Sequence, residues 1–142
     1  MRLADARPLL AGRVGLRLEE ADETRDGDAL RALATWALRF SPLVAEDPPA
    51  GLLLDAFGLS RLFGSETTWM RRVTEGVAKL GIHVRAAIAD TIGCAWAVAH
   101  HGETLQAIVP SGEERSALGP LPIAALRVDD DVVERLFEVG VE

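Results

Sequence analysis

Cysteine and lysine are scarce in this chain of 142 residues. The single cysteine, Cys94, excludes an internal disulfide and is expected to be a small buried hydrophobe in a helix. Lys79 is the only lysine, and the net charge is -7 at pH 7. Affinity for DNA comes largely from Lys and Arg that neutralise phosphates, so this balance argues against independent binding to nucleic acid.

Long hydrophobic runs and targeting signals are also missing. Hydrophobic residues make up 49% of the chain, yet no run approaches the roughly 20 apolar residues of a membrane-spanning helix. Residues 1–5 lack the basic and apolar regions of a signal peptide. We therefore expect a soluble cytoplasmic protein of one domain that has no membrane partner. The chain also lacks a glycine-rich phosphate loop, a cysteine-pair zinc motif and a Ser-His-Asp arrangement.

A short apolar run at residues 51–57 is the expected centre of the fold. Pro48-Pro49 cannot continue a helix or a central strand, and the run that follows is too short for a helix, so it indicates a buried strand. Residues 43–47 are expected to pair with it through the Pro-Pro turn, with residues 14–18 as an alternative strand. Two further short strands are predicted near residues 83–89 and 105–109.

Segments with the apolar spacing of a helix lie between these predicted strands. The first stripe has Asp26 or Asp28 as the expected N-cap and ends before Pro42. Its members are Leu30, Leu33, Ala34, Ala37 and Leu38, widened by Trp36 and Phe40, which are expected in the core rather than as a platform for stacking bases. Further helices are predicted from the N-cap Ser65 to Gly81, from the N-cap Thr91 to Gly102, and from the N-cap Asp129 to Gly140.

The predicted apolar faces of these later helices follow the same spacing rule. They comprise Trp69, Met70, Val73, Val77 and Leu80 in one helix, Ile92, Ala95, Trp96 and Ala99 in the next, and Val132, Val133, Leu136 and Phe137 in the last. Residues 59–64 and the loop at residues 110–114 are expected to be irregular. Strands interleaved with helices indicate the α+β class, with one sheet of about four short strands covered by helices.

Two segments carry a specific resemblance. They are Leu54-Asp55 with the following Gly58-Leu59-Ser60-Arg61-Leu62-Phe63-Gly64, and Arg85-Ala86-Ala87-Ile88-Ala89-Asp90-Thr91 with its continuation to Ala99. Both resemble the ImuB-type branch of the Y-family (UmuC/DinB-like) translesion DNA polymerases. The resemblance implies a ferredoxin-like palm sheet and a catalytically inactive protein.

The same resemblance divides the chain. Residues 1–12 would be the remnant of the helix joining fingers to palm, residues 13–112 the palm-like domain, and residues 118–142 the start of the thumb with the first helix of a helix-hairpin-helix. The sequence is expected to be a fragment that starts at a methionine internal to the family pattern and ends within the thumb. Most partner-binding regions of the family would follow residue 142.

The residues expected at the catalytic centre of such a polymerase are missing. In active members the central strand reads roughly Ser-Ile-Asp-Glu-Ala-Tyr-Leu-Asp, which places the metal-binding Asp-Glu pair on Ala50 and Gly51. Mg²⁺ needs oxygen ligands, usually carboxylates, and neither residue offers one. Asp55 is the residual acid, expected as a polar residue at the end of the strand. No catalytic residue, cofactor or metal site is therefore predicted.

The resemblance indicates a second position at which a residue needed for polymerase activity is replaced. His100 falls where the resemblance places a lysine that contacts the nucleotide phosphates, and His101 follows it. A neutral imidazole does not replace a permanent cation beside three phosphates. Adjacent histidines also leave a helix end in different directions, so a partly exposed pair is expected rather than a metal site.

The resemblance implies an adaptor in DNA-damage-induced (SOS) mutagenic translesion synthesis. Its partners would be an error-prone replicative-type polymerase, the sliding clamp and an ImuA-type protein, with DNA bound weakly or only within a complex. Arg61, Arg71 and Arg72 are candidates for contact with a DNA backbone or a partner, although solvated surface charge is the simpler interpretation. Two alternatives stay open: a Mg²⁺-dependent nucleotidyltransferase that uses Asp47 and Asp55, and a degenerate fragment without a selected function.

Overall fold

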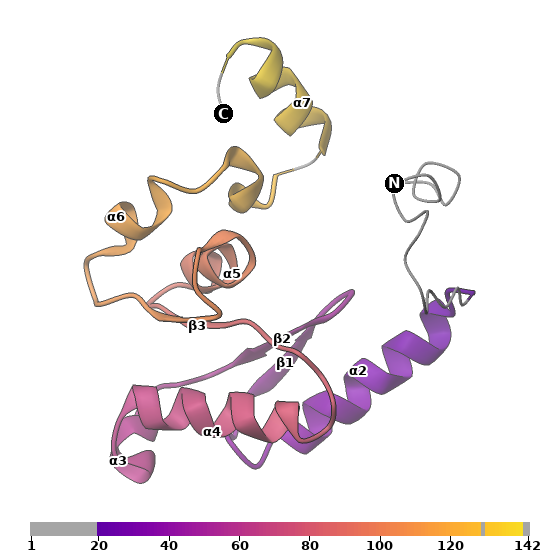
Figure 1. Cartoon of the computed structure of the whole chain (residues 1–142), viewed down its shortest axis with the longest axis vertical. Helices are drawn as coiled ribbons and strands as arrows, with labels where there is room; N and C mark the ends of the chain where they lie inside the picture. Colours follow the sequence, from indigo (N-terminus) through magenta and orange to yellow (C-terminus); the bar gives the residue numbers. More distant parts are fainter. Residues whose placement is uncertain (1–19, 129, 141–142) are drawn as a thin grey trace, which may run out of the picture.

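Helices are interspersed with short strands in the computed structural model, which describes residues 20–128 and 130–140 (Figure 1). The helices are α2 (Glu23–Ala37), α3 (Leu59–Phe63), α4 (Glu66–Ala78), α5 (Ile92–His101), α6 (Glu114–Leu118), the 3₁₀ helix η1 (Ile123–Leu126) and α7 (Asp130–Glu138). The strands are β1 (Val44–Asp47), β2 (Gly51–Leu54), β3 (Ala86–Ile88) and β4 (Gln106–Ile108). This arrangement confirms the α+β class. The helix remnant predicted at residues 1–12 and the alternative strand at residues 14–18 lie outside the described residues.

The four described strands form two separate two-stranded sheets. β1 and β2 pair as an antiparallel hairpin from Val44↔Leu54 to Asp47↔Gly51, and β3 runs parallel to β4. The prediction of one four-stranded sheet is therefore wrong for the described part of the chain. β2 and β3 are shorter than predicted, since residues 55–57 and 82–85 lie outside them. No backbone hydrogen-bond ladder connects β2 with β3 or β4.

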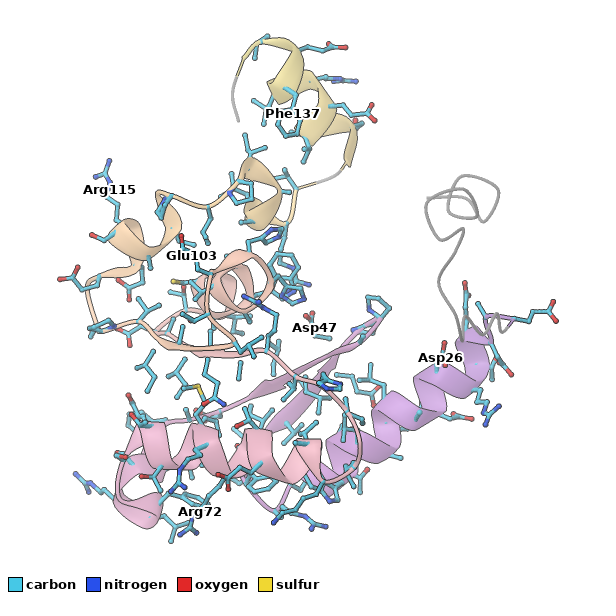
Figure 2. All side chains as sticks on the ribbon, viewed as in Figure 1. Asp26, Asp47, Arg72, Glu103, Arg115 and Phe137 are labelled. Carbon is cyan, nitrogen blue, oxygen red and sulfur yellow. The ribbon has the colours of Figure 1, made fainter. Side chains whose placement is uncertain are left out.

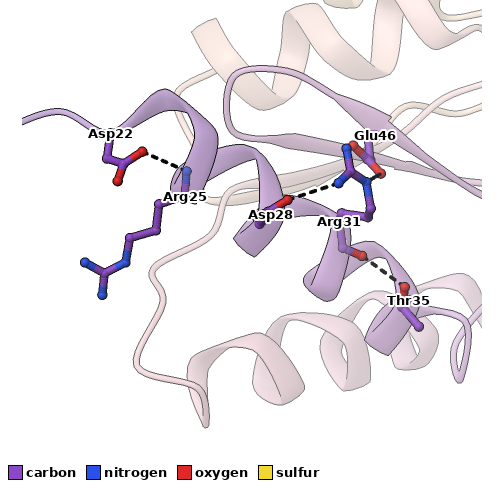
Figure 3. A network of polar contacts seen from close by, with 6 residues as sticks. All are labelled: Asp22, Arg25, Asp28, Arg31, Thr35 and Glu46. Atoms are coloured by element: carbon purple, nitrogen blue, oxygen red, sulfur yellow. Dashed lines mark hydrogen bonds and ion pairs between the residues drawn. The ribbon is translucent and has the colours of Figure 1, made fainter.

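The N-cap of α2 is Asp22, four to six residues before the predicted caps Asp26 and Asp28. Asp22 Oδ1 accepts a hydrogen bond from the Arg25 backbone N–H at 3.0 Å, while Glu23 and Asp26 add favourable negative charge to the first turn. Asp28 instead pairs with Arg31, whose guanidinium also lies 3.7 Å from Glu46 in β1 (Figure 3). The predicted caps Asp26 and Asp28 are therefore inside the helix.

The chain between α2 and the hairpin is held by one buried hydroxyl. α2 buries Leu30, Ala34 and Ala37, as its periodicity predicts, whereas Leu38 is 52% exposed and belongs to the following turn. Ser41 is almost fully buried, and its Oγ lies 2.9 Å from the Leu43 carbonyl oxygen and 2.8 Å from the Asp55 carbonyl oxygen. A buried polar group must be paired, so this contact fixes where the hairpin starts.

The caps predicted for the two central helices are confirmed. The Ser65 hydroxyl accepts from the Thr68 N–H at 3.0 Å, and the Thr91 hydroxyl accepts from the Cys94 N–H at 3.2 Å. α4 buries Trp69, Met70, Thr74 and Val77, close to its predicted stripe, but Leu80 lies beyond the helix and is 50% exposed.

The core of the second sheet lies under α5. Figure 1 shows β3 between α4 and α5, and both helices contact β3 and β4. α5 buries Cys94, Ala97 and Val98, and Cys94 and Val98 pack with Val109. The predicted apolar face of this helix is wrong, because Ile92 is 62% exposed. Both faces of α5 are apolar, so periodicity alone did not distinguish them.

Three short helices were not predicted: α3, which lies where an irregular connection was expected, and α6 and η1. Each has four or five residues, too few to show a repeat of 3.6. α7 confirms the predicted helix, and Gly140 after it has a positive φ of 81°, while the predicted N-cap Asp129 lies outside the described residues. Its apolar side is only partly covered, since Phe137 is 50% exposed. None of the described helices is long and apolar enough to cross a membrane.

Candidate functional site

The tip of the β1–β2 hairpin is the candidate site. A cis peptide bond joins Pro48 to Pro49, Ala50 completes the turn, and Gly51 opens β2 opposite Asp47. Figure 2 shows Asp47 between the hairpin and the part of the molecule that holds α5 and η1. The positions predicted to have lost the metal-binding pair therefore lie at an exposed turn, and their side chains are a methyl group and a hydrogen.

Gly51 has no room for a side chain. A Cβ added there would lie 2.8 Å from the Asp47 backbone oxygen and 3.1 Å from its Oδ2. Real Cβ atoms are essentially never found as close as the first of these distances. A carboxylate at position 51 would require the hairpin tip to shift, so the local backbone matches glycine.

Asp47 is held by a residue that lies 80 positions further along the chain. Its Oδ1 accepts from Arg127 Nη2 at 2.8 Å, and the Asp47 side chain is only 13% exposed. Arg127 follows η1 in the left-handed region, with a φ of 55°. Charge-assisted hydrogen bonds of this length are among the stronger polar contacts in proteins. The pair therefore fixes the hairpin tip to the segment after η1.

Arg127 also joins Trp96 and the histidine pair to this site. Its guanidinium carbon lies 4.7 Å from the centre of the Trp96 ring, which stacks on His100 at a centroid distance of 4.0 Å. The His100 Nδ1 lies 2.9 Å from the Trp96 carbonyl oxygen. We call Asp47, Ala50, Gly51, Trp96, His100 and Arg127 the hairpin site. It contains one paired acid, one paired arginine and an exposed imidazole.

Asp55 does not belong to the hairpin site. Its backbone N–H donates to Leu43 at 3.0 Å, beyond the last paired residues of the hairpin, and its Oδ1 accepts from the Phe57 N–H at 2.8 Å. Four residues of strand separate it from Gly51, which faces Asp47, so about 13 Å lies between the two acids. One Mg²⁺ ion binds oxygens at about 2 Å and does not bridge that distance.

The part of the chain that the structure describes holds no group of three or more metal-ligating side chains. The alternative enzyme reading requires Asp47 and Asp55 to share metal ions. The hairpin register places these acids at opposite ends, so the geometry gives that reading no support.

The three arginines predicted for DNA or partner contact have separate surroundings. Arg61 lies exposed in α3, Arg71 pairs with Glu75 at 3.5 Å, and the Arg72 guanidinium lies 5.5 Å from the Phe63 ring centre. Figure 2 shows Arg72 beside α4, remote from Asp47. These arginines are not part of the hairpin site, and their contact with DNA or a partner stays a prediction.

Arg85, the first residue of the second motif, has a structural role. Its guanidinium donates to the carbonyl oxygens of Ala99, Gly102 and Thr104, the last at 2.9 Å. These oxygens surround the C-terminus of α5, where backbone carbonyls lack partners within the helix. Arg85 therefore fixes the end of the helix that presents His100, and the sequence analysis did not identify this role.

Cys94 is the one group whose acidity is clearly shifted among the described residues. Burial raises the pKa of its thiol above 9.0, and the nearby Glu114 carboxylate adds to this increase. Thiolates, not thiols, are nucleophiles, so Cys94 is unreactive at neutral pH. The prediction of a small buried hydrophobe is confirmed by its 1% exposure.

The sequence analysis missed two residues of the hairpin site, Trp96 and Arg127. The four-residue spacing of Trp96 and His100 on one helix is compatible with stacking and was available from the sequence. The contact of Arg127 with Asp47 had no local pattern that would predict it, because the two residues are far apart in the chain.

Comparison with known proteins identifies two relatives that match most of the chain. Protein ImuB of Caulobacter vibrioides strain NA1000 / CB15N is 44% identical over 119 residues, which is 84% of this chain and 26% of the relative. Protein ImuB of Caulobacter vibrioides strain ATCC 19089 / CIP 103742 / CB 15 gives the same values. The chain thus spans about a quarter of the length of these relatives.

No family model matches the chain, and no solved structure matches it significantly. The structure of the chain shows the α+β class, and the two relatives show its common ancestry with ImuB. Identity of 44% over more than a hundred residues reflects common ancestry. The chain is homologous to part of protein ImuB.

Proposed function

We propose that this chain is a non-catalytic, polymerase-like palm that serves as an adaptor in DNA-damage-induced mutagenic translesion synthesis. Residues 13–112 form the palm-like part and residues 118–142 the start of a thumb in this proposal. The proposal rests on the homology to ImuB and on the resemblance to Y-family polymerases, together with the chemistry of the hairpin site.

The residues at the hairpin tip are the main support for proposing that the chain is non-catalytic. Nucleotidyl transfer requires Mg²⁺ held by carboxylates, and Ala50 and Gly51 provide no oxygen ligand. The Asp47 carboxylate is already bonded to Arg127 at 2.8 Å, and Gly51 has no space for a larger residue. Loss of one preorganised charge-stabilising group commonly costs about two to three decades in rate, so two missing ligands abolish useful turnover.

The C-terminal end of α5, which carries His100, supports the same proposal. His100 stacks on Trp96 and occupies the position where the resemblance places a lysine, whose permanent positive charge would contact the phosphates. The net charge of -7 disfavours DNA binding by the chain alone. In the proposed role, DNA is reached only within a complex.

Three partners fit this role: the sliding clamp, an error-prone replicative-type polymerase and an ImuA-type protein. These partners are proposed from the homology and the resemblance, and the cell compartment proposed for the assembly is the cytoplasm. A scaffold without chemistry of its own is useful only if it holds other proteins together, so binding is the property to test.

The test is a pull-down with the full tagged chain. The purified clamp, polymerase and ImuA-type protein are offered singly and together, and an unrelated tagged acidic protein of similar size serves as control. We expect at least one of the three to be retained above the control. Retention of none, singly or together, would remove the adaptor proposal for this chain.

A further inference from the structure

A groove lies where the C-terminal end of α2 and the turn after it meet α4, and none of its lining residues belongs to the hairpin site. Its volume is about 430 Å³, enough for a large side chain and the backbone beside it. Two aromatic rings and three basic side chains account for most of its lining: Trp36, Phe40, Arg39, Arg72 and Lys79. Nothing in the proposed function uses this groove.

Gly76 creates the floor of the groove. A Cβ at this position would lie 2.9 Å from both Phe40 Cζ and Trp36 Cη2, so both rings lie directly on the glycine backbone. The rings meet edge to face at 5.2 Å and are half-buried. Trp69 adds a further constraint, because its Nε1 donates to the Phe40 carbonyl oxygen at 2.8 Å. The groove is thus a preformed feature.

The rim of the groove is positive in a chain that is negative overall. Arg39, Arg72 and Lys79 face a single acid, Glu75, and that carboxylate is already paired with Arg71. Within residues 20–128 and 130–140, no ion pair involves any of the three rim cations. Arg39 is held in place by its Nε bond to the Trp36 carbonyl oxygen at 2.9 Å.

We propose that this groove binds an acidic peptide segment of a partner protein. An apolar side chain of the segment would lie against Trp36 and Phe40, and its carboxylates would pair with the three rim cations. Buried aromatic anchors and arginines are the residues that supply most of the free energy in protein interfaces. Complementary charge on the rim sets specificity and speeds association.

Nucleic acid is the less suitable occupant for this groove. The guanidinium of Arg39 lies 4.8 Å from the centre of the Trp36 ring and covers one of its faces, whereas base stacking needs an open aromatic face. A phosphate backbone would also meet the repulsion of a chain with net charge -7. A short acidic segment brings fewer charges and an apolar anchor.

The test is a binding titration with the full chain and a labelled short peptide in which one Phe is flanked by Glu and Asp. Fluorescence anisotropy reports the affinity, and labelled oligothymidylate is titrated in parallel. The groove variant carries Arg72→Glu and Lys79→Glu. The matched control carries Arg25→Glu and Arg115→Glu, exposed arginines of α2 and α6 outside the groove lining, so both variants have the same net charge. Circular dichroism checks that both remain folded.

We expect the peptide to bind the wild-type chain and the control within about twofold of each other, and the groove variant at least about tenfold more weakly. Replacing the peptide's Phe with Ser weakens binding, and so does raising salt. Absence of peptide binding, equal weakening in both variants, or oligothymidylate binding that depends on the same two cations would each overturn the proposal. The titration needs no clamp or polymerase, so its outcome is independent of the adaptor pull-down.

Discussion

Arg127 Nη2 lies 2.8 Å from Asp47 Oδ1, and this pair connects two segments that are 80 residues apart in the chain. One partner lies at the tip of the β1–β2 hairpin and the other directly follows η1. The acid that would be the nearest candidate for a metal ligand at the hairpin tip is thus bonded to an arginine.

The Asp47–Arg127 pair should stabilise the fold more than an exposed pair does. Asp47→Asn, Arg127→Ala and the double variant form a cycle, for which we expect a coupling free energy of about 1 kcal/mol, discounted for the 40% exposure of Arg127. Urea unfolding measures each free energy of unfolding. The control cycle uses Asp131 and Arg135, exposed and 3.8 Å apart, whose coupling should be near zero. Equal couplings in the two cycles would refute the structural role of the Asp47 pair.

Gly51 should be intolerant of any side chain. Gly51→Ala is expected to destabilise the chain by about 1–3 kcal/mol, because the added Cβ meets the Asp47 backbone. Gly27→Ala is the control, since nothing lies within 4 Å of a Cβ there. In the interior of a helix such as α2, alanine is more favourable than glycine by up to about 1 kcal/mol. Thermal unfolding compares the two. A neutral or stabilising Gly51→Ala would show that the hairpin tip has room for a ligand.

Arg85 should be needed for its forked geometry rather than for its charge alone. Arg85→Lys keeps the charge but does not reach the carbonyl oxygens of Ala99, Gly102 and Thr104 together, and we expect a loss of about 1–2 kcal/mol. Hydrogen exchange should also speed up at the C-terminal turn of α5. The exposed Arg115→Lys serves as control and should change neither quantity. Unaltered exchange in Arg85→Lys would contradict the assigned role.

Cys94 makes stability depend on alkaline pH. Burial raises the pKa of its folded-state thiol above 9.0, so the folded chain holds this proton more tightly than the unfolded chain. Its contribution to stability is complete below the pKa of the unfolded thiol and is lost as the pH rises towards the pKa of the folded thiol. Urea unfolding at pH 7 and at pH values above 9 should show a steeper decline for the wild type than for Cys94→Ala. Parallel declines would show that the thiol titrates alike in both states.

Capping, helical periodicity and turn rules predicted those elements that depend only on residues close together in the sequence. The caps Ser65 and Thr91, the α2 stripe through Leu30 and Ala34, and the turn at Pro48-Pro49 each depend on a few neighbouring residues. The short helices α3 and α6 escaped prediction because five residues hold little more than one turn, too short to reveal a period.

Long-range contacts account for what the sequence did not predict. The pairing of strands into two sheets depends on which backbone groups meet after folding, and the strands of three and four residues give weak patterns. For the hairpin site, residue identity singled out Ala50, Gly51 and His100, and their correspondence to catalytic and phosphate-binding positions of a polymerase stays a prediction. The contact of Arg127 with Asp47 and Trp96 required three-dimensional information, since no spacing rule joins residues so far apart.

The most direct test of the central claim is a titration of the full chain with Mn²⁺, followed by the relaxation of water protons. Mn²⁺ takes the same oxygen ligands as Mg²⁺. We predict only weak, non-saturating binding that is unchanged in Asp47→Asn and in Asp55→Asn, because the two acids lie at opposite ends of the hairpin and Ala50 and Gly51 carry no ligand. A saturable site that either substitution abolishes would contradict the account and restore a metal-dependent function.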